Sequence, residues 1–219
     1  MNNIVLIGFM GSGKTTFGRW VSRRHNRKFY DTDEYIEKKQ NTTISEIFAT
    51  KGEEAFRDME TETVKELSDT LDNCVISVGG GLVLREVNRE LLRKLGTVVY
   101  LKASEEELCK RLSKDTKRPL LQGGGLHEKI HNLMEQREDI YLDAADMIVD
   151  TQKMSFEQMY TAIIKNMESI KSRIDKNAQV VAVIKTDGYG HGAAQIARVL
   201  EPDEQVWGYA VATAEEAFS

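Results

Sequence analysis

A glycine-rich segment near the N-terminus contains residues of the types that bind phosphate. It reads Gly8-Phe-Met-Gly11-Ser-Gly13-Lys14-Thr15 and matches the pattern G-x4-G-K-[ST]. Glycines at these positions let successive backbone N–H groups turn toward phosphate oxygens. The lysine can reach the β- and γ-phosphates, and the threonine hydroxyl can ligate Mg2+. The alternative is a glycine-rich turn that only caps a helix. We predict a nucleotide site formed by Gly11, Ser12, Gly13, Lys14, Thr15 and Thr16.

The elements that must hold this loop alternate between short apolar strands and helices. Apolar segments predict strands at 4–7, 28–31, 74–78, 97–101 and 147–149. Helical segments are predicted at 14–25, 33–40, 44–71, 86–95, 104–113, 127–142 and from 155 onward, with breaks near Asn41 and Gly52. This alternation predicts a parallel α/β sheet with helices on both faces. Ligands of such sheets bind at the carboxyl ends of the strands.

Six further motifs follow in order along the chain. They are Asp31-Thr-Asp33, Ile44-Ser-Glu46-Ile47-Phe48, Gly52-Glu53-Glu54-Ala-Phe56-Arg57-Asp-Met-Glu60, Gly79-Gly80-Gly81, Arg118-Pro119-Leu120-Leu121 and Arg137-Glu-Asp-Ile-Tyr141. Each motif is short, but with the phosphate loop the ordered set closely resembles shikimate kinase over about residues 1–160. The resemblance implies a P-loop fold like that of nucleoside monophosphate kinases. It also implies transfer of phosphate from ATP to the 3-hydroxyl of shikimate, which gives shikimate 3-phosphate and ADP.

Two other functions remain open. One is a related P-loop kinase for another small polyol or acid, and the other is a nucleotide-binding module without transfer activity. A site that binds a carboxylate would distinguish a kinase for a small acid from a nucleotide-binding module, because the module does not need such a site.

The resemblance implies an acceptor site for a molecule with one carboxylate and three hydroxyls. Arg57 and Arg137 offer planar guanidinium groups suited to the carboxylate. Asp33 would bind the reacting hydroxyl and take its proton. The glycines Gly79, Gly80 and Gly81 would offer backbone N–H groups. The pocket would also be shaped by Phe48, Phe56, Glu60 and Leu120.

The resemblance also assigns residues to ATP and Mg2+. Lys14 and Arg118 would neutralise charge during transfer, and Arg118 lies on a polar loop that would close over the reactants. Thr15 and Asp31 would hold Mg2+, with Asp31 acting through water. Arg111 would pack on the adenine.

Each assigned residue also has a plainer structural interpretation. Asp31 and Asp33 are of the type that caps helices. Arg57 can pair with Glu53 or Glu60, which lie one helical turn away. The three glycines could form a plain flexible turn. The remaining arginines could be solvated charges: Arg111, Arg118 and Arg137.

A competing motif occurs on the predicted helix 127–142. His127-Glu128-Lys129-Ile130-His131 matches H-E-x-x-H, which places two imidazoles one turn apart, as in zinc proteases. Such a site needs a third ligand, and no supporting pattern follows. We therefore do not predict a zinc site here.

The C-terminal segment, assigned to a second domain over 161–219, has a different character. Residues 182–192 and 206–217 resemble the start of alanine racemase, a pyridoxal phosphate enzyme with a (β/α)8 barrel. Lys185 matches the Schiff-base lysine, and Tyr189 matches a tyrosine near the cofactor. Such a barrel needs about 250 residues, and about 55 correspond to one or two of its eight units. We therefore expect an incomplete, inactive barrel fragment that does not bind pyridoxal phosphate tightly.

The composition of the chain restricts its partners and its location in the cell. The chain has 219 residues and a net charge of −5, which argues against nucleic acid as the main partner. No apolar stretch is long enough to span a membrane, and no signal peptide is recognised. Cys74 and Cys109 are predicted to be buried free thiols. We expect a cytoplasmic protein whose kinase part is a monomer.

Overall fold

The structure is a computed structural model that describes residues 2–113, 125–173, 180–183 and 206–210, with side chains up to residue 169. The chain forms two compact units, Met1–Met167 and Glu168–Ser219. The polar loop that carries Arg118 and Leu120 lies outside the described residues, as do Lys185 and Tyr189.

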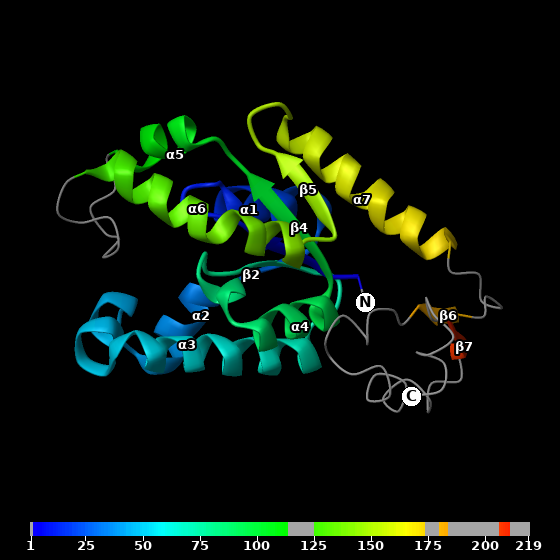
Figure 1. The fold of residues 1–219 in the computed structure, drawn as a ribbon, viewed down its shortest axis with the longest axis horizontal. Coiled ribbons are helices and arrows are strands. Elements are labelled where there is room, and N and C mark those ends of the chain that lie inside the picture. The colour runs from blue at the N-terminus through cyan, green and yellow to red at the C-terminus, as the bar shows by residue number, and fades with distance from the viewer. Residues whose placement is uncertain (1, 114–124, 174–179, 184–205, 211–219) are drawn as a thin grey trace. The chain divides into compact units, whose positions relative to one another are not determined.

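A five-stranded sheet forms the centre of the first unit (Figure 1). Its strands are β1 (Ile4–Ile7), β2 (Lys28–Asp31), β3 (Cys74–Ser77), β4 (Thr97–Lys102) and β5 (Met147–Asp150). All neighbouring strands are parallel, in the order β2-β3-β1-β4-β5. The predicted parallel α/β sheet is confirmed. Because the strands are parallel, the segments that follow β1, β2 and β3 leave the sheet at the same edge.

Helices cover both faces of this sheet. They are α1 (Lys14–His25), α2 (Thr32–Gln40), α3 (Ile44–Thr70), α4 (Glu86–Leu95), α5 (Glu105–Leu112), α6 (Leu126–Ala144) and α7 (Phe156–Arg173). Side chains alternate between the two faces along a strand. Val5 and Ile7 therefore pack with apolar residues of α3, α4, α5 and α6. Ile4 and Leu6 pack on the opposite face with residues of α1 and α7.

The α2–α3 corner has local causes in the sequence. Thr43 and Glu46 form a capping box that starts α3. Gly52 has φ 83° and ψ 172°, which is outside the helical range and kinks α3 at the predicted position. Ile36, Ile47 and Phe56 form a small separate core there. This core holds the segment of α3 that carries Arg57.

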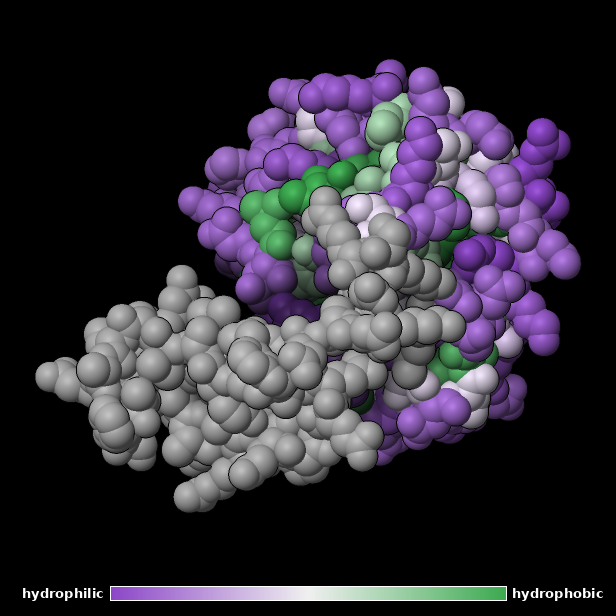
Figure 2. Space-filling model, turned by 90° about the vertical axis from the view of Figure 1, so that its right-hand side faces the viewer, coloured by the Kyte–Doolittle hydropathy of each residue, from purple (hydrophilic) through white to green (hydrophobic). Residues whose placement is uncertain are grey.

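In Figure 2 most of the visible coloured face is hydrophilic, interrupted by narrow apolar patches.

Both cysteines are free; Cys74 is buried as predicted, but Cys109 is only half-buried. The prediction for Cys109 was wrong because Leu108 and Leu112 are the residues of α5 that face the core. None of the described helices is long and apolar enough to cross a membrane.

The second unit contains one described pair of parallel strands, β6 (Val180–Val183) and β7 (Val206–Ala210). Apolar segments at 180–184 and 206–211 predict both strands. The sequence also predicts a helix over 190–200, which lies outside the described residues. The barrel fragment therefore stays a prediction.

Candidate active site

The phosphate loop connects β1 to α1 and requires glycine where its backbone is crowded. Gly8 has φ 139°, and a Cβ there would lie 2.7 Å from the carbonyl oxygen of Leu101. Lys14 Nζ donates hydrogen bonds to the carbonyl oxygens of Gly8 (2.7 Å) and Phe9 (3.0 Å). The Lys14 side chain therefore lies along the loop whose bound phosphates it would contact.

A cavity of about 370 Å³ opens beside this loop. Its polar wall contains all the described residues that were predicted to bind the nucleotide: Gly11, Ser12, Gly13, Lys14, Thr15, Thr16 and Arg111. Its other wall is partly apolar, with Leu101, Phe156 and Met159. A cavity with a phosphate-binding wall and an apolar wall suits a nucleotide, and its volume is typical of small-molecule sites. The interpretation of the glycine-rich segment as only a helix cap does not account for this cavity.

Arg111 is held against the phosphate loop. Its Nε donates to Glu107 Oε1 (2.8 Å), and Nη1 donates to the carbonyl oxygen of Gly11 (3.2 Å). The residue is exposed, as the solvated-helix interpretation expects, and the bond to Gly11 directs its guanidinium to the loop. These two bonds fix the plane of the guanidinium at the wall of the cavity, while its packing on adenine stays a prediction.

Thr15 and Asp31 lie together at the strand ends. The hydroxyl of Thr15 donates to Asp31 Oδ2 (2.8 Å), while Asp31 Oδ1 accepts from the backbone N–H of Asp33 (3.1 Å) and caps α2. The capping interpretation is thus correct for Asp31, and its second oxygen remains next to the threonine. Hydroxyl and carboxylate oxygens are the ligands that Mg2+ prefers. Across the described ranges, no three His, Cys, Asp or Glu residues could hold a metal by themselves.

A second, smaller cavity adjoins the glycine turn after β3. Its lining includes all six residues predicted to bind the acceptor: Asp33, Arg57, Gly79, Gly80, Gly81 and Arg137. Phe48, Phe56 and Glu60 also line it, as predicted. Met10 and Ile44 also line it; neither was assigned to the acceptor site, although Ile44 begins one of the ordered motifs. Met10 occupies a variable position of the phosphate-loop pattern, so nothing in the motif indicated that it faces the acceptor.

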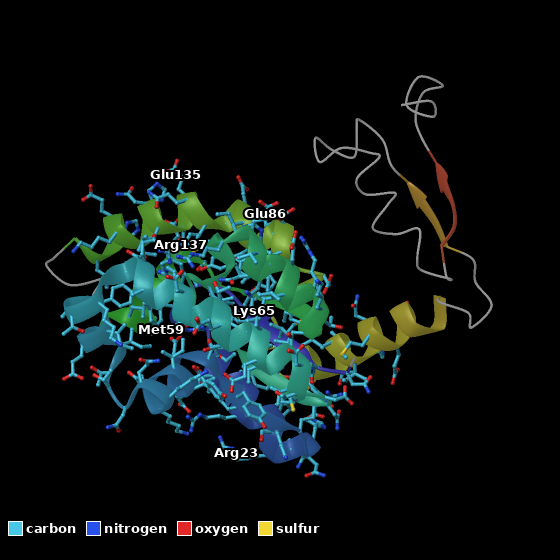
Figure 3. All side chains as sticks on the ribbon, turned by 90° about the horizontal axis from the view of Figure 1, so that it is seen from below. Arg23, Met59, Lys65, Glu86, Glu135 and Arg137 are labelled. Atoms are coloured by element: carbon cyan, nitrogen blue, oxygen red, sulfur yellow. The ribbon has the colours of Figure 1, made fainter. Side chains whose placement is uncertain are left out.

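The two arginines of this cavity are buried. Arg57 Nη2 donates to Glu53 and Nη1 donates to Glu60, both at 2.7 Å. The ion pairs offered as the plainer interpretation therefore exist. A guanidinium has five N–H groups, so these bonds leave others for a ligand. Arg137, on α6 (Figure 3), is 6% exposed and not a solvated charge.

The glycine turn is tightly packed. A Cβ at Gly79 would lie 2.7 Å from Asp33 Oδ1 and 2.8 Å from Glu60 Oε1, and one at Gly81 would lie 2.5 Å from Arg57 Nη1. The turn therefore packs against side chains of α2 and α3, and its role as a donor of backbone N–H groups stays a prediction. Gly80 lies against the phosphate loop, because a Cβ there would be 3.4 Å from the backbone nitrogen of Met10. This packing places the acceptor cavity next to the phosphate loop.

Asp33 lies in the first turn of α2 and does not cap it, since the N-cap is Asp31. Its carboxylate is close to Gly79 and to Glu60, which is fully buried. Burial raises the pKa of Glu60 to about 7, with Arg57 opposing the rise and Asp33 adding to it. The cavity thus combines two buried cations with two adjacent carboxyl groups.

We expect this burial of Glu60 to appear as a pH dependence of stability. Its folded-state pKa lies above the ordinary value of 4.5. Between these two values the folded state binds more protons than the unfolded state, so stability falls as the pH rises. The contribution is roughly 3 kcal/mol across that window. Urea unfolding from pH 4.5 to 7.5 should show a steeper loss for the wild type than for Glu60→Gln. Equal slopes would contradict this assignment.

The H-E-x-x-H segment does not form a metal site among the described residues. His131 Nδ1 lies 3.1 Å from both carboxylate oxygens of Glu105 and is exposed. Glu105 belongs to α5, so this contact joins two helices at the surface.

The fold and its two adjoining cavities define a P-loop kinase of the α/β class. Residues 10–168 match the family model described as shikimate kinase, and residues 159–219 match that of the alanine racemase N-terminal domain. The shikimate kinase of Dictyoglomus turgidum is 43% identical over 169 residues, 76% of this chain and 97% of that protein. That of Pelotomaculum thermopropionicum is 45% identical over 164 residues, 75% and 94% of the two chains.

A solved structure gives the same result. The shikimate kinase of Acinetobacter baumannii, in complex with shikimate, superposes with a TM-score of 0.72. It is 36% identical, and the match covers 78% of this chain and 95% of that one. The chain belongs to the shikimate kinase family.

Proposed function

We propose that this protein transfers the γ-phosphoryl group of ATP to the 3-hydroxyl of shikimate, producing shikimate 3-phosphate and ADP. The observation that carries the proposal is the second cavity. It places two buried arginines and Asp33 directly beside the phosphate loop. A nucleotide-binding module has no use for such a pair of cations, whereas a small carboxylic acid acceptor requires one.

The acceptor would be oriented by charge at one end and by hydrogen bonds at the other. Arg57 and Arg137 would bind its carboxylate. The backbone of the glycine turn and the Asp33 carboxylate would bind its hydroxyls. Because the acceptor would lie next to the phosphate loop, its hydroxyl and the γ-phosphoryl group would both be held in place before transfer. This lowers the entropic cost of the reaction.

In the transfer itself, the hydroxyl oxygen attacks the γ-phosphorus as its proton passes to Asp33. The bond from the γ-phosphorus to the bridging oxygen breaks, and ADP leaves with that oxygen. Lys14 would neutralise charge on the phosphates, and Arg118 would add to it. Thr15 and, through water, Asp31 would hold Mg2+, which would supply further charge neutralisation on the phosphates. We propose that the kinase unit acts as a monomer.

A coupled assay of ADP release tests this proposal. ADP formation should depend on added shikimate, and phosphate should appear on its 3-hydroxyl by 31P NMR. ADP release that is the same without shikimate, or that needs a different polyol or acid, would contradict the assigned acceptor.

We expect the reaction to need Mg2+. Chelation should abolish turnover, and added Mg2+ should restore it. Thr15→Val removes the hydroxyl ligand at nearly constant volume and should raise the Mg2+ concentration needed for half-maximal rate about tenfold or more. Thr50→Val removes the same hydroxyl from an exposed threonine that lines neither cavity and is the matched control. Restoration by Zn2+ alone would instead revive the metal site at His127 and His131.

The kinase unit should act without the second unit. Met159, Ile163 and Met167 of α7 are buried in the core of the first unit, so a chain cut after Arg173 keeps them. We expect such a chain to keep kcat and both KM values within about twofold of the full chain, since both cavities are lined by residues of the first unit. A loss of shikimate turnover on truncation, with the fold intact by circular dichroism, would show that the second unit takes part.

A further inference from the structure

Tyr141 is a fully buried residue of α6 that lies four residues after Arg137. Its hydroxyl donates a hydrogen bond of 2.6 Å to the carbonyl oxygen of Gly80. Arg137 precedes Tyr141 by one helical turn, so the two side chains lie on the same face of α6. The hydrogen bond to Gly80 therefore ties the turn of α6 that carries Arg137 to the glycine turn, two parts of the acceptor cavity that are distant in sequence.

The bond to Gly80 also sets the direction of the next peptide N–H. In a trans peptide the C=O and the following N–H point in opposite directions, and the structure contains no cis peptide. With the Gly80 carbonyl directed at Tyr141, the N–H of Gly81 points away from that hydroxyl. Within the part of the chain that the structure describes, this N–H donates to no backbone oxygen, and Gly81 lines the cavity. It is available to an acceptor hydroxyl.

We propose that Tyr141 is a positioning residue of the acceptor site: its hydrogen bond to Gly80 holds the Gly80–Gly81 peptide at a fixed separation from the turn of α6 that carries Arg137. That separation would match the distance between the carboxylate and a hydroxyl of the bound acid. The inference rests on the proposed function. Groups held in place before binding lose less freedom when the ligand arrives, so the hydroxyl would raise affinity without touching the ligand.

Tyr100 of β4 provides a matched control. It is also buried, and its ring stacks on that of Tyr141 with centroids 5.1 Å apart and planes at 23°. Its hydroxyl has no hydrogen-bond partner among the described residues. Tyr100→Phe and Tyr141→Phe thus remove the same atom from neighbouring rings of one core, but only the second removes the hydrogen bond between α6 and Gly80.

The test uses the full chain with Tyr141→Phe, Tyr100→Phe and the wild type. Calorimetry gives the shikimate Kd, and steady-state kinetics give both KM values and kcat. In Tyr141→Phe we expect the shikimate Kd and KM to rise about tenfold, the effect of one net hydrogen bond. The KM for ATP should stay within about twofold, since the phosphate loop is unchanged. In Tyr100→Phe all constants should stay within about twofold, because no bond is lost.

A double-mutant cycle separates positioning from packing. If Tyr141 acts partly through Arg137, Tyr141→Phe should weaken shikimate binding less in an Arg137→Ala background than in the wild type. Equal effects of the two tyrosine variants, or a parallel loss of ATP affinity, would overturn the inference in favour of a packing role. A wild type that neither binds nor phosphorylates shikimate would overturn both proposals. An active wild type with an unchanged Tyr141→Phe variant would overturn this one alone.

Discussion

Replacing Asp33 by Asn is expected to reduce kcat by about 10²–10⁴-fold, the usual contribution of a general base. The amide keeps the shape of the carboxylate but cannot take the proton of the acceptor hydroxyl. The fold should be retained, because α2 is capped by Asp31 and not by Asp33. Steady-state kinetics at saturating ATP and shikimate, with thermal unfolding as a check, measure both quantities.

Glu34 offers a control for the loss of charge. It lies next to Asp33 in the first turn of α2 but forms an exposed ion pair with Arg19. Glu34→Gln removes one negative charge from the same turn and should change kcat less than about twofold, since exposed pairs contribute little. If Asp33→Asn kept full turnover at saturating substrates, Asp33 would not be the base.

Replacing Arg57 by Ala is expected to affect both binding and stability. Loss of one charged hydrogen bond to the acceptor costs roughly 1.5–3 kcal/mol, or about 10- to 150-fold in shikimate affinity. The same change leaves Glu60 buried without its ion-pair partner. Breaking a buried pair in this way costs about 3–5 kcal/mol of stability. Calorimetric titration and urea unfolding measure the two effects separately.

Two further variants separate these effects. Adding Glu60→Gln to Arg57→Ala removes the partnerless carboxyl group and should recover stability at pH values where that carboxyl is ionised, without recovering shikimate affinity. Arg85 also pairs with carboxylates of α3, Glu54 and Asp58, but at the exposed surface. Arg85→Ala should therefore cost less than about 1 kcal/mol and leave shikimate affinity unchanged. Equal losses of ATP and shikimate affinity in Arg57→Ala would show that Arg57 has only a structural role.

Local features of the chain were sufficient to predict the elements and the phosphate loop. The glycine pattern of the loop is contiguous, so its conformation depends on neighbouring residues. The kink in α3 depends on one residue, Gly52, with its positive φ. The gathering of the acceptor residues was also predictable in outline. Their motifs follow parallel strands or occupy neighbouring helices, and parallel strands end at one edge of the sheet.

Burial was harder to predict than secondary structure. Arg57, Glu60 and Arg137 carry charges that residue type alone places at the surface. They are buried because each charge has a partner or a cavity supplied by another segment. The H-E-x-x-H pattern shows the reverse case. His131 has the right spacing for a zinc ligand, but its contact with Glu105 uses a neighbouring helix and makes a surface pair.

The contacts that give the two cavities their geometry join residues far apart in the chain. Tyr141 and Gly80 are 61 residues apart, Gly79 and Thr32 are 47 apart, and Arg111 and Gly11 are 100 apart. A hydrogen bond requires its two atoms to meet within about 3.2 Å, and motif spacing carries no information at that scale. Residue types and their order are thus enough to indicate the chemistry. The relative placement of the groups follows only from how the helices pack on the sheet.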